Sequence, residues 1–196
     1  MTDFDLLLAS RSPRRRQLLQ QLGVRFQCVD PEVDERPHAG EPVAELVPRL
    51  ALAKAGAGAA QSRFACPVLG ADTEVVLDGE VLGKPADVSA AVAMLRRLSG
   101  RDHLVYSAVA VAHREQAVLT SITRVFFRVM TAEEMENYCR RDESLDKAGG
   151  YGIQGLAAAF IERIEGSYSG VMGLPLFETA TLLSRFDIPM GRPPTS

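Results

Sequence analysis

Three lysines stand apart in a chain whose other basic residues are all arginine. Of the 22 basic residues in this 196-residue sequence, only Lys54, Lys84 and Lys147 are lysine. They lie beside small or bend-forming residues, in the segments AKA, GKP and DKAG, and outside any run of surface charge. A compact ammonium group suits a phosphate oxygen in a narrow cleft better than a planar guanidinium group does. The pattern predicts three phosphate-binding lysines, and three ordinary surface lysines are the alternative.

A second group of cations falls at the predicted start of a helix. Ser12 is a favourable N-cap residue and Pro13 suits the first helical position, so a helix is expected from residue 13 until Gly23. Arg14 and Arg15 lie in its first turn, where the helix dipole disfavours positive charge unless an anion binds there. With the Ser12 hydroxyl and the unpaired N–H groups they would form a phosphate site. Arginines that simply point to solvent are the alternative.

Two carboxylates could complete this chemistry. The segment VLGAD predicts a short apolar strand that ends at Asp72, and open α/β sheets place their sites at strand ends. A carboxylate there can hold Mg²⁺ or polarise an attacking water molecule. Glu35 lies in an acidic, proline-containing loop, and an ordinary turn role is the alternative for both residues. The three histidines lie far apart, so a hard ion such as Mg²⁺ or Mn²⁺ is the expected metal.

The elements that must position these residues alternate between helix and strand. Strands are predicted at 6–9, 24–29, 68–72, 74–77, 80–82, 103–112 and 117–130, and helices at 13–22, 42–60, 90–98, 131–141 and 176–186. Asp78-Gly79 favours a hairpin, and the polar turn at 113–116 predicts antiparallel pairing of its flanking strands. The predicted fold class is α/β, with a mixed, partly antiparallel sheet bent so that two lobes face a deep cleft.

Single residues refine this picture. Thr131 and Glu134 have the spacing of a capping box. Pro48 predicts a kink in the helix at 42–60, whose many alanines predict close packing against another element. Residues 146–155 contain four glycines and are expected to form a site loop or a tight backbone crossing. Residues 190–196 are expected to be a flexible tail of a single domain that covers 1–196.

Composition and missing motifs exclude several classes of protein. A net charge of −3 argues against a protein that coats nucleic acid. No stretch approaches 18 consecutive apolar residues, so no membrane span is expected. Three cysteines match no disulfide or zinc pattern and indicate reduced thiols in the cytoplasm. The sequence has no Walker loop, GxGxxG, GxSxG or HExxH, which disfavours P-loop ATPases, Rossmann enzymes, serine hydrolases and zinc proteases.

Taken in order, the motifs resemble the Maf family of nucleotide pyrophosphatases. The matching segments are LLLASRSPRRRQLLQQLG, VDE at 33–35, RLALAKA, VLGADTEVVLDGEVLGKP, AMLRRLSG, LDKAGGYGIQG and GSYSGVMGLPL. The resemblance implies an elongated central sheet with flanking helices, two lobes around a deep cleft, and a homodimer. This fold is also that of inosine triphosphate pyrophosphatases. Arg11 departs from the pattern, since relatives often have glycine between the two serines, and this puts the local loop shape in doubt.

Within the family, the sequence is most similar to the branch that hydrolyses dTTP and UTP. That branch has GADT and GIQG where the 7-methyl-GTP branch has segments like GSDQ and SEG. By this resemblance, Asp72 is the catalytic proton acceptor, and Arg14, Thr73 and Gln154 select the substrate. Asp72 and Glu35 would hold the metal, and Lys54 and Lys84 match charged cleft positions of the family. The chemistry of the residues agrees, because an amide at Gln154 can pair with the O4 and N3–H groups of uracil or thymine.

Two other functions stay open from sequence. The enzyme could act on 7-methyl-GTP or another modified nucleotide. Alternatively, the chain could be a regulatory binding protein in cell division, since the family name is associated with septum formation.

Overall fold

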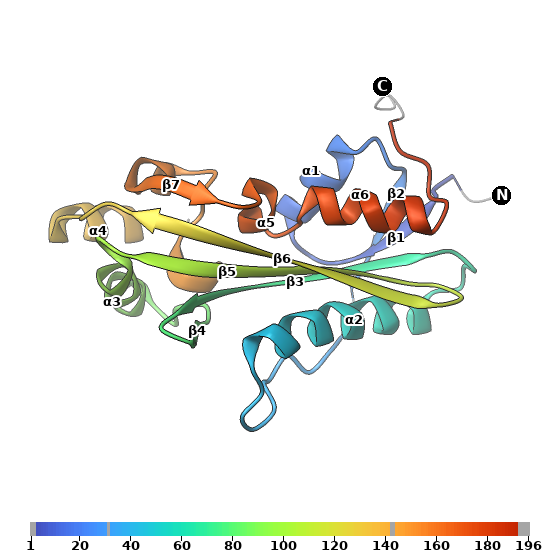
Figure 1. The fold of residues 1–196 in the computed structure, drawn as a ribbon, viewed down its shortest axis with the longest axis horizontal. Coiled ribbons are helices and arrows are strands. Elements are labelled where there is room, and N and C mark those ends of the chain that lie inside the picture. Colours follow the sequence, from blue (N-terminus) through green and yellow to red (C-terminus); the bar gives the residue numbers. More distant parts are fainter. Residues whose placement is uncertain (1–2, 31, 142–143, 192–196) are drawn as a thin grey trace.

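The chain forms one long mixed sheet with helices on both faces (Figure 1). The structure, a computed structural model, describes residues 3–30, 32–141 and 144–191. The strands are β1 (Leu6–Ala9), β2 (Phe26–Val29), β3 (Val68–Leu77), β4 (Glu80–Leu82), β5 (Asp102–Ala112), β6 (Gln116–Phe127) and β7 (Ile161–Glu165). The helices are α1 (Pro13–Gln21), α2 (Val43–Gln61), α3 (Val88–Leu98), α4 (Ala132–Cys139), α5 (Tyr168–Met172) and α6 (Leu176–Arg185), with short 3₁₀ turns at Ala148–Gly150 and Leu156–Phe160.

The strand order confirms the predicted α/β class and the mixed sheet. The order is β2-β1-β3-β5-β6-β7, and β4 pairs with β3 beside this path. The pairs β1–β2 and β1–β3 are parallel, and the others are antiparallel. β3, β5 and β6 have 10, 11 and 12 residues, which makes the sheet elongated. Of the predicted tail, only residues 190 and 191 are described, in no helix or strand, and 192–196 lie outside the described residues.

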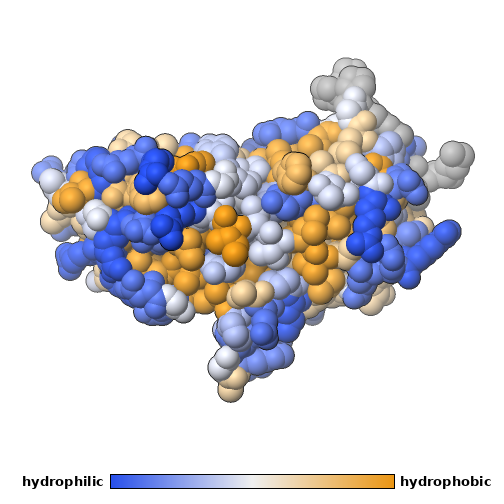
Figure 2. Space-filling model, in the orientation of Figure 1, coloured by the Kyte–Doolittle hydropathy of each residue, from blue (hydrophilic) through white to orange (hydrophobic). Residues whose placement is uncertain are grey.

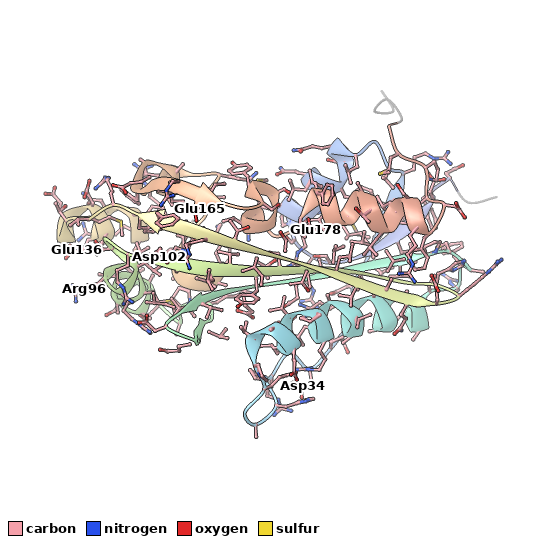
Figure 3. The ribbon with its side chains drawn as sticks, viewed as in Figure 1. Asp34, Arg96, Asp102, Glu136, Glu165 and Glu178 are labelled. Carbon is pink, nitrogen blue, oxygen red and sulfur yellow. The ribbon has the colours of Figure 1, made fainter. Side chains whose placement is uncertain are left out.

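Two apolar clusters divide this sheet along its length. One joins β1, α1 and α6 to the near halves of β3 and β5, with Leu69 and Val109 in the strands. The other joins β4, α3 and α4 to the far halves of the same strands, with Val75 and Val105. The long central strands therefore connect two lobes. In Figure 3 the charged side chains labelled Arg96, Asp102, Glu136 and Glu165 lie in the second lobe, far from Asp34 beside α2.

Local capping signals predicted the helix starts well. Ser12 accepts a hydrogen bond from the Arg15 N–H and begins α1, and Pro13 is its first residue. Thr131 and Glu134 form the predicted capping box of α4. Because Asp87 caps α3, that helix begins at Val88, two residues earlier than predicted. Among the described helices, none combines the length and apolar character needed to cross a membrane.

Helix α2 lies directly against β3, as its alanines predicted. A Cβ atom on Gly70 would lie 2.4 Å from the Ala51 carbonyl oxygen and 2.5 Å from the Ala55 nitrogen. Only glycine leaves room for a helix backbone this close to a strand. Pro48 lies inside α2 without interrupting it. Because the two backbones lie so close together, the side chains on this face of α2 can reach the strand.

The prediction of two strands in residues 68–77 was wrong, because β3 is continuous. Asp72 lies in the middle of the strand and not at its end, since β5 pairs with β3 from Val68 to Val76. The opposite edge is divided. β1 pairs with residues 68–70 and β4 with residues 75–77. Within the described chain, residues 71–74 thus have no partner strand on that edge, and the sheet is open there.

Candidate active site

A cleft of about 1030 Å³ lies at this opening in the sheet. Its volume is at the upper end of the range of about 300–1,000 Å³ that is typical of small-molecule sites. Every site residue predicted from sequence lines it, namely Ser12, Arg14, Arg15, Glu35, Lys54, Asp72, Thr73, Lys84, Lys147 and Gln154. All three lysines of the chain are in this set. Segments far apart in sequence therefore converge on residues 71–74 of β3.

Lys54 joins two carboxylates on the α2 face of the sheet. Its Nζ atom lies 2.7 Å from Asp72 Oδ1 and 2.7 Å from Glu35 Oε1. Asp72 points to this face because Gly70, two residues earlier in the strand, contacts α2. Lys54 and Asp72 are 9% and 5% exposed, so their charges are buried as a pair. The ion pair therefore holds the Asp72 carboxylate in a fixed position beside α2.

Glu35 reaches this pair from the loop before α2. Its neighbour Asp34, labelled in Figure 3, marks the position of that loop on the α2 side of the sheet. Burial acts to raise the pKa of Glu35, but the hydrogen bond from Lys54 and the charges of Lys54, Lys84 and Arg15 lower it overall. The loop therefore contributes a negative charge at neutral pH.

Glu74 is a fourth charged residue of this cluster and was not singled out from sequence. It lies two residues after Asp72 on the same strand, so its side chain leaves the same face. Burial, followed by the charge of Asp72, raises its pKa to about 7. The signal was the alternation of a continuous strand, which was missed because the strand was divided at this point. One oxygen of each residue, Asp72 Oδ2 and Glu74 Oε2, is buried and has no partner among the described residues.

The opposite face of β3 carries Thr73 and a buried arginine. Arg15 donates through Nε to the Gly173 carbonyl oxygen at 2.7 Å and through Nη2 to Thr73 Oγ1 at 3.4 Å. Burial lowers the pKa of this guanidinium group, and the negative charge of Asp72 partly compensates. Arg15 thus lies inside the cleft, and the alternative of a solvent-facing arginine is wrong for this residue. Gly173 has a φ of 116° and leaves space for this side chain.

The glycine-rich segment forms the far wall of the cleft. Lys147 Nζ lies 2.5 Å from Asp146 Oδ1, and Arg14 Nη1 lies 3.4 Å from Asp146 Oδ2. Burial of Asp146 opposes its ionisation, but hydrogen bonding to Lys147 and the charges of Lys147 and Arg14 lower its pKa overall. A Cβ atom on Gly152 would lie 2.7 Å from Lys147 Cε, so glycine lets the lysine cross the segment. Two cations from distant segments thus share one carboxylate.

Two tyrosines fix this wall in place. The Gly152 N–H donates to the Tyr138 hydroxyl at 3.0 Å, and Tyr151 OH lies 2.6 Å from His103 Nε2. Burial lowers the pKa of His103 to about 4, so its ring is neutral at neutral pH and forms a hydrogen bond with the tyrosine hydroxyl through Nε2. Gln154 lies at the exposed end of the wall, three residues after Tyr151. Its main chain is held rigidly although its side chain is exposed.

Among the described residues that line the cleft, the charged groups able to bind a metal ion are carboxylates. The described residues contain no group of three or more histidine, cysteine, aspartate or glutamate side chains arranged to hold a metal ion. The predicted pair, Asp72 and Glu35, is bridged by Lys54. However, the unpartnered oxygens of Asp72 and Glu74 are hard donors of the type that Mg²⁺ and Mn²⁺ prefer. These residues fit a divalent ion whose remaining ligands are water and phosphate oxygens.

The chain is similar to several known proteins and matches the model of one family. The model of the family described as Maf-like protein matches residues 5–186. Three similar proteins are each named dTTP/UTP pyrophosphatase. One from Bordetella avium is 53% identical, with 93% of this chain and 96% of that protein covered. One from Aromatoleum aromaticum is 50% identical, with 94% and 97% covered. One from Escherichia coli is 50% identical, with 93% of both chains covered.

Among solved structures, the chain is similar to a nucleoside-triphosphatase, dITP/XTP pyrophosphatase, from Mycobacterium abscessus. The TM-score is 0.40 and the identity 22%, over 62% of this chain and 73% of the other.

Proposed function

The chain belongs to the Maf family, and from this premise we propose that it hydrolyses UTP and dTTP to the monophosphate and pyrophosphate. One observation carries the proposal. Six cations and a carboxylate cluster, drawn from six separate segments, line one cleft at an opening in the sheet. A triphosphate carries about four negative charges, and cations of this number neutralise them. The similar proteins named dTTP/UTP pyrophosphatase support the choice of substrate.

The phosphates bind at the start of α1 and along the lysines. Arg14, Arg15 and the main-chain N–H groups after Ser12 act at the positive end of the helix dipole. Lys84 and Lys147 add positive charge from the opposite wall of the cleft. Lys54 has a double role, because it binds phosphate oxygen while it holds Asp72 and Glu35 in place.

Hydrolysis requires a water molecule in line with the bond that breaks. The water oxygen attacks the α-phosphorus, and the bond from that phosphorus to the oxygen bridging the α and β groups breaks. Asp72 accepts the proton of the water, and the electron pair of the broken bond leaves with pyrophosphate. Lys54 binds Asp72 Oδ1 and limits rotation of the carboxylate, which leaves Oδ2 in place for this transfer.

A divalent cation, Mg²⁺ or Mn²⁺, is proposed as the cofactor. Asp72 and Glu74 would hold it through their unpartnered oxygens, and when bound it would withdraw negative charge from the phosphate oxygens.

Base recognition is assigned to Gln154, Thr73 and Arg14. An amide presents one donor and one acceptor, which matches the neighbouring O4 and N3–H groups of uracil and thymine. Guanine offers the same pair at O6 and N1–H but adds a 2-amino group, and a single amide leaves that additional donor without a partner. A buried polar group without its partner costs about 1–3 kcal/mol, which corresponds to a preference of about tenfold or more.

The test is a phosphate-release assay with added inorganic pyrophosphatase across UTP, dTTP, CTP, GTP and 7-methyl-GTP. We expect pyrophosphate from UTP and dTTP with kcat/KM at least about tenfold above that for GTP. Preference for 7-methyl-GTP would contradict the substrate but leave the reaction intact. The absence of pyrophosphate from every nucleotide would contradict the reaction itself.

We further propose that the protein is a homodimer of the cytoplasm that does not bind nucleic acid. Figure 2 shows apolar residues reaching the surface over the middle of the molecule, with hydrophilic residues at both ends. Large apolar side chains are exposed at Ile122, Val129 and Phe177, at 51%, 76% and 79%. Light scattering coupled to size exclusion measures the mass, and a monomer of 21.2 kDa would contradict the dimer.

A further inference from the structure

Three hydroxyl and guanidinium groups form a directed chain of hydrogen bonds behind Thr73. Thr73 and Ser107 are directly opposite each other on β3 and β5, and their side chains share one face of the sheet. Thr73 Oγ1 lies 3.0 Å from Ser107 Oγ. Ser107 Oγ lies 2.6 Å from the carbonyl oxygen of Gly170 in α5. Ser107 is 1% exposed, so no bulk water replaces these contacts.

The direction of each bond follows from the carbonyl group. A carbonyl oxygen has no proton, so at 2.6 Å the Ser107 hydroxyl must donate to Gly170. Ser107 has only one proton, and its oxygen can therefore only accept from Thr73. Thr73 must then donate its own single proton to Ser107. Arg15 Nη2 donates to Thr73 Oγ1 from another side, at 3.4 Å, so Thr73 Oγ1 is the acceptor in this bond.

On its cleft side, Thr73 Oγ1 can therefore accept a hydrogen bond but cannot donate one. Its proton is committed to a buried partner, and the cleft meets only an oxygen lone pair. Uracil and thymine carry a proton on N3, whereas cytosine has a lone pair there. An acceptor fixed in this way can share the N3–H proton of the first two bases with the Gln154 amide oxygen, and it repels the N3 lone pair of the third, as buried polar sites discriminate most strongly against groups that leave them unpaired.

We propose that Ser107, held by the Gly170 carbonyl, fixes the Thr73 hydroxyl as an acceptor and so makes the cleft select pyrimidines with a proton on N3 over cytosine. Ser107 is a positioning residue, since it acts through Thr73. The inference rests on the proposed function and on the assignment of Thr73 to base recognition. It adds the residue that sets the polarity of Thr73, and it separates UTP from CTP, two nucleotides of the same size and charge.

The experiment measures kcat/KM for UTP and CTP with the parent and with Ser107→Ala, Ser107→Cys and Thr73→Val. The parent is expected to prefer UTP by at least about tenfold. Ser107→Ala releases the Thr73 proton, which can then turn to the cleft and bind cytosine N3, so the preference should decrease by about fivefold or more. Ser107→Cys nearly preserves side-chain volume but supplies a poor acceptor, and should act in the same direction. Thr73→Val should remove the preference, and Ser107→Ala should add nothing to it.

Ser121→Ala is the matched control. Ser121 lies opposite Ser107 on β6, and the side chains that hydrogen-bond to Thr73 Oγ1 are those of Ser107 and Arg15, so loss of the Ser121 hydroxyl should leave the UTP to CTP ratio unchanged. A ratio within about twofold of the parent in both Ser107 variants would overturn the inference. A parent that hydrolyses UTP and dTTP but treats CTP equally would overturn it while leaving the proposed function standing. A parent that hydrolyses no pyrimidine triphosphate would overturn both.

Discussion

At the scale of single residues, Lys54 holds the carboxylate that we propose as the proton acceptor. Without Lys54, the buried Asp72 would have no hydrogen-bond partner among the described side chains, because Lys54 binds Oδ1 and Oδ2 has no partner there. Removal of one member of a buried ion pair leaves a charge that the interior cannot solvate. Catalysis and local stability therefore depend on the same contact.

Asp72→Asn should abolish turnover while leaving the fold and nucleotide binding nearly intact. The change removes one charge and the proton acceptor but keeps the side-chain volume. Steady-state kinetics with UTP, together with binding of UTP measured by calorimetry, checks this. Turnover within about tenfold of the parent would remove Asp72 from the role of proton acceptor or metal ligand.

Lys54→Ala and Lys84→Ala should each lower kcat/KM by more than about tenfold, since each removes a cation from the phosphate path. Lys54→Ala should also lower Tm, because it leaves Asp72 unpaired, whereas the exposed Lys84 should change Tm little. Arg114→Ala, an exposed cation outside this cleft, is the control. Equal kcat/KM values for both lysine variants and the control would show that the rarity of lysine was coincidence.

Glu74 should make stability decrease with pH. In the unfolded chain its pKa is close to 4.5, and in the fold it is about 7. Between these values the folded state keeps a proton that the unfolded state has lost. Glu74 therefore stabilises the fold most below pH 4.5, and this contribution is lost as pH rises through about 7.

Glu74→Gln removes this titration. Its Tm relative to the parent should increase as pH rises from about 5 to about 8. Glu133→Gln, at an exposed position in α4, should show a constant difference. A constant difference for Glu74→Gln as well would contradict the raised pKa.

At the scale of elements, local signals predicted what is local. Caps, the Asp78-Gly79 hairpin and the apolar periodicity gave the helix starts and most strands, and the hairpin has positive φ at both residues. The continuity of β3 could not be obtained in this way. Asp72 and Glu74 disfavour a strand interior locally, and it is the pairing with β5 along nine positions that keeps the strand extended. Glu74 was missed for the same reason.

Gly70→Ala should destabilise the fold strongly, because the new Cβ atom would lie 2.4 Å from a backbone oxygen of α2. Neither the helix nor the strand can move away without losing backbone hydrogen bonds. Overpacking of this kind costs about 1–3 kcal/mol or more. Gly83→Ala, where no atom lies within 4 Å of the new Cβ, should change the free energy of unfolding little. Chemical denaturation of both variants measures the difference, and equal losses would contradict the close approach.

At the scale of the whole molecule, the sequence predicted the cleft residues but not how they meet. Each of the ten residues was found from its type and neighbours or from the family resemblance, and each lines the cleft. The two faces of β3 were not predicted. Asp72 and Glu74 lie on the face that α2 covers, where Asp72 contacts Lys54. Thr73 lies on the other face, where it contacts Arg15 of α1 and, through Ser107, the Gly170 carbonyl group of α5. Contacts between residues 18, 58 and 63 positions apart set this arrangement, and no local pattern records them.

The proposed choice of base depends on the whole molecule, because Thr73 lies on β3 and Gln154 lies on the far wall of the cleft. The double variant Gln154→Glu with Thr73→Gln should erode the preference for UTP over GTP from at least about tenfold to less than about threefold, since the wall would then present acceptors to the donors of guanine. Values of kcat/KM for UTP, dTTP, CTP, GTP and 7-methyl-GTP check this. An unchanged profile would contradict the assignment of these two residues.

The open edge at residues 71–74 also bears on solubility. An unpaired strand edge invites a strand of another molecule to add to it, which is a common route to aggregation. Here β1 and β4 cover the edge on both sides, and the interval between them is only four residues long. The charged side chains of Asp72 and Glu74 lie within it. The interval is too short and too charged for a strand of another molecule to pair with it. The sheet can therefore admit a ligand at this edge without promoting aggregation.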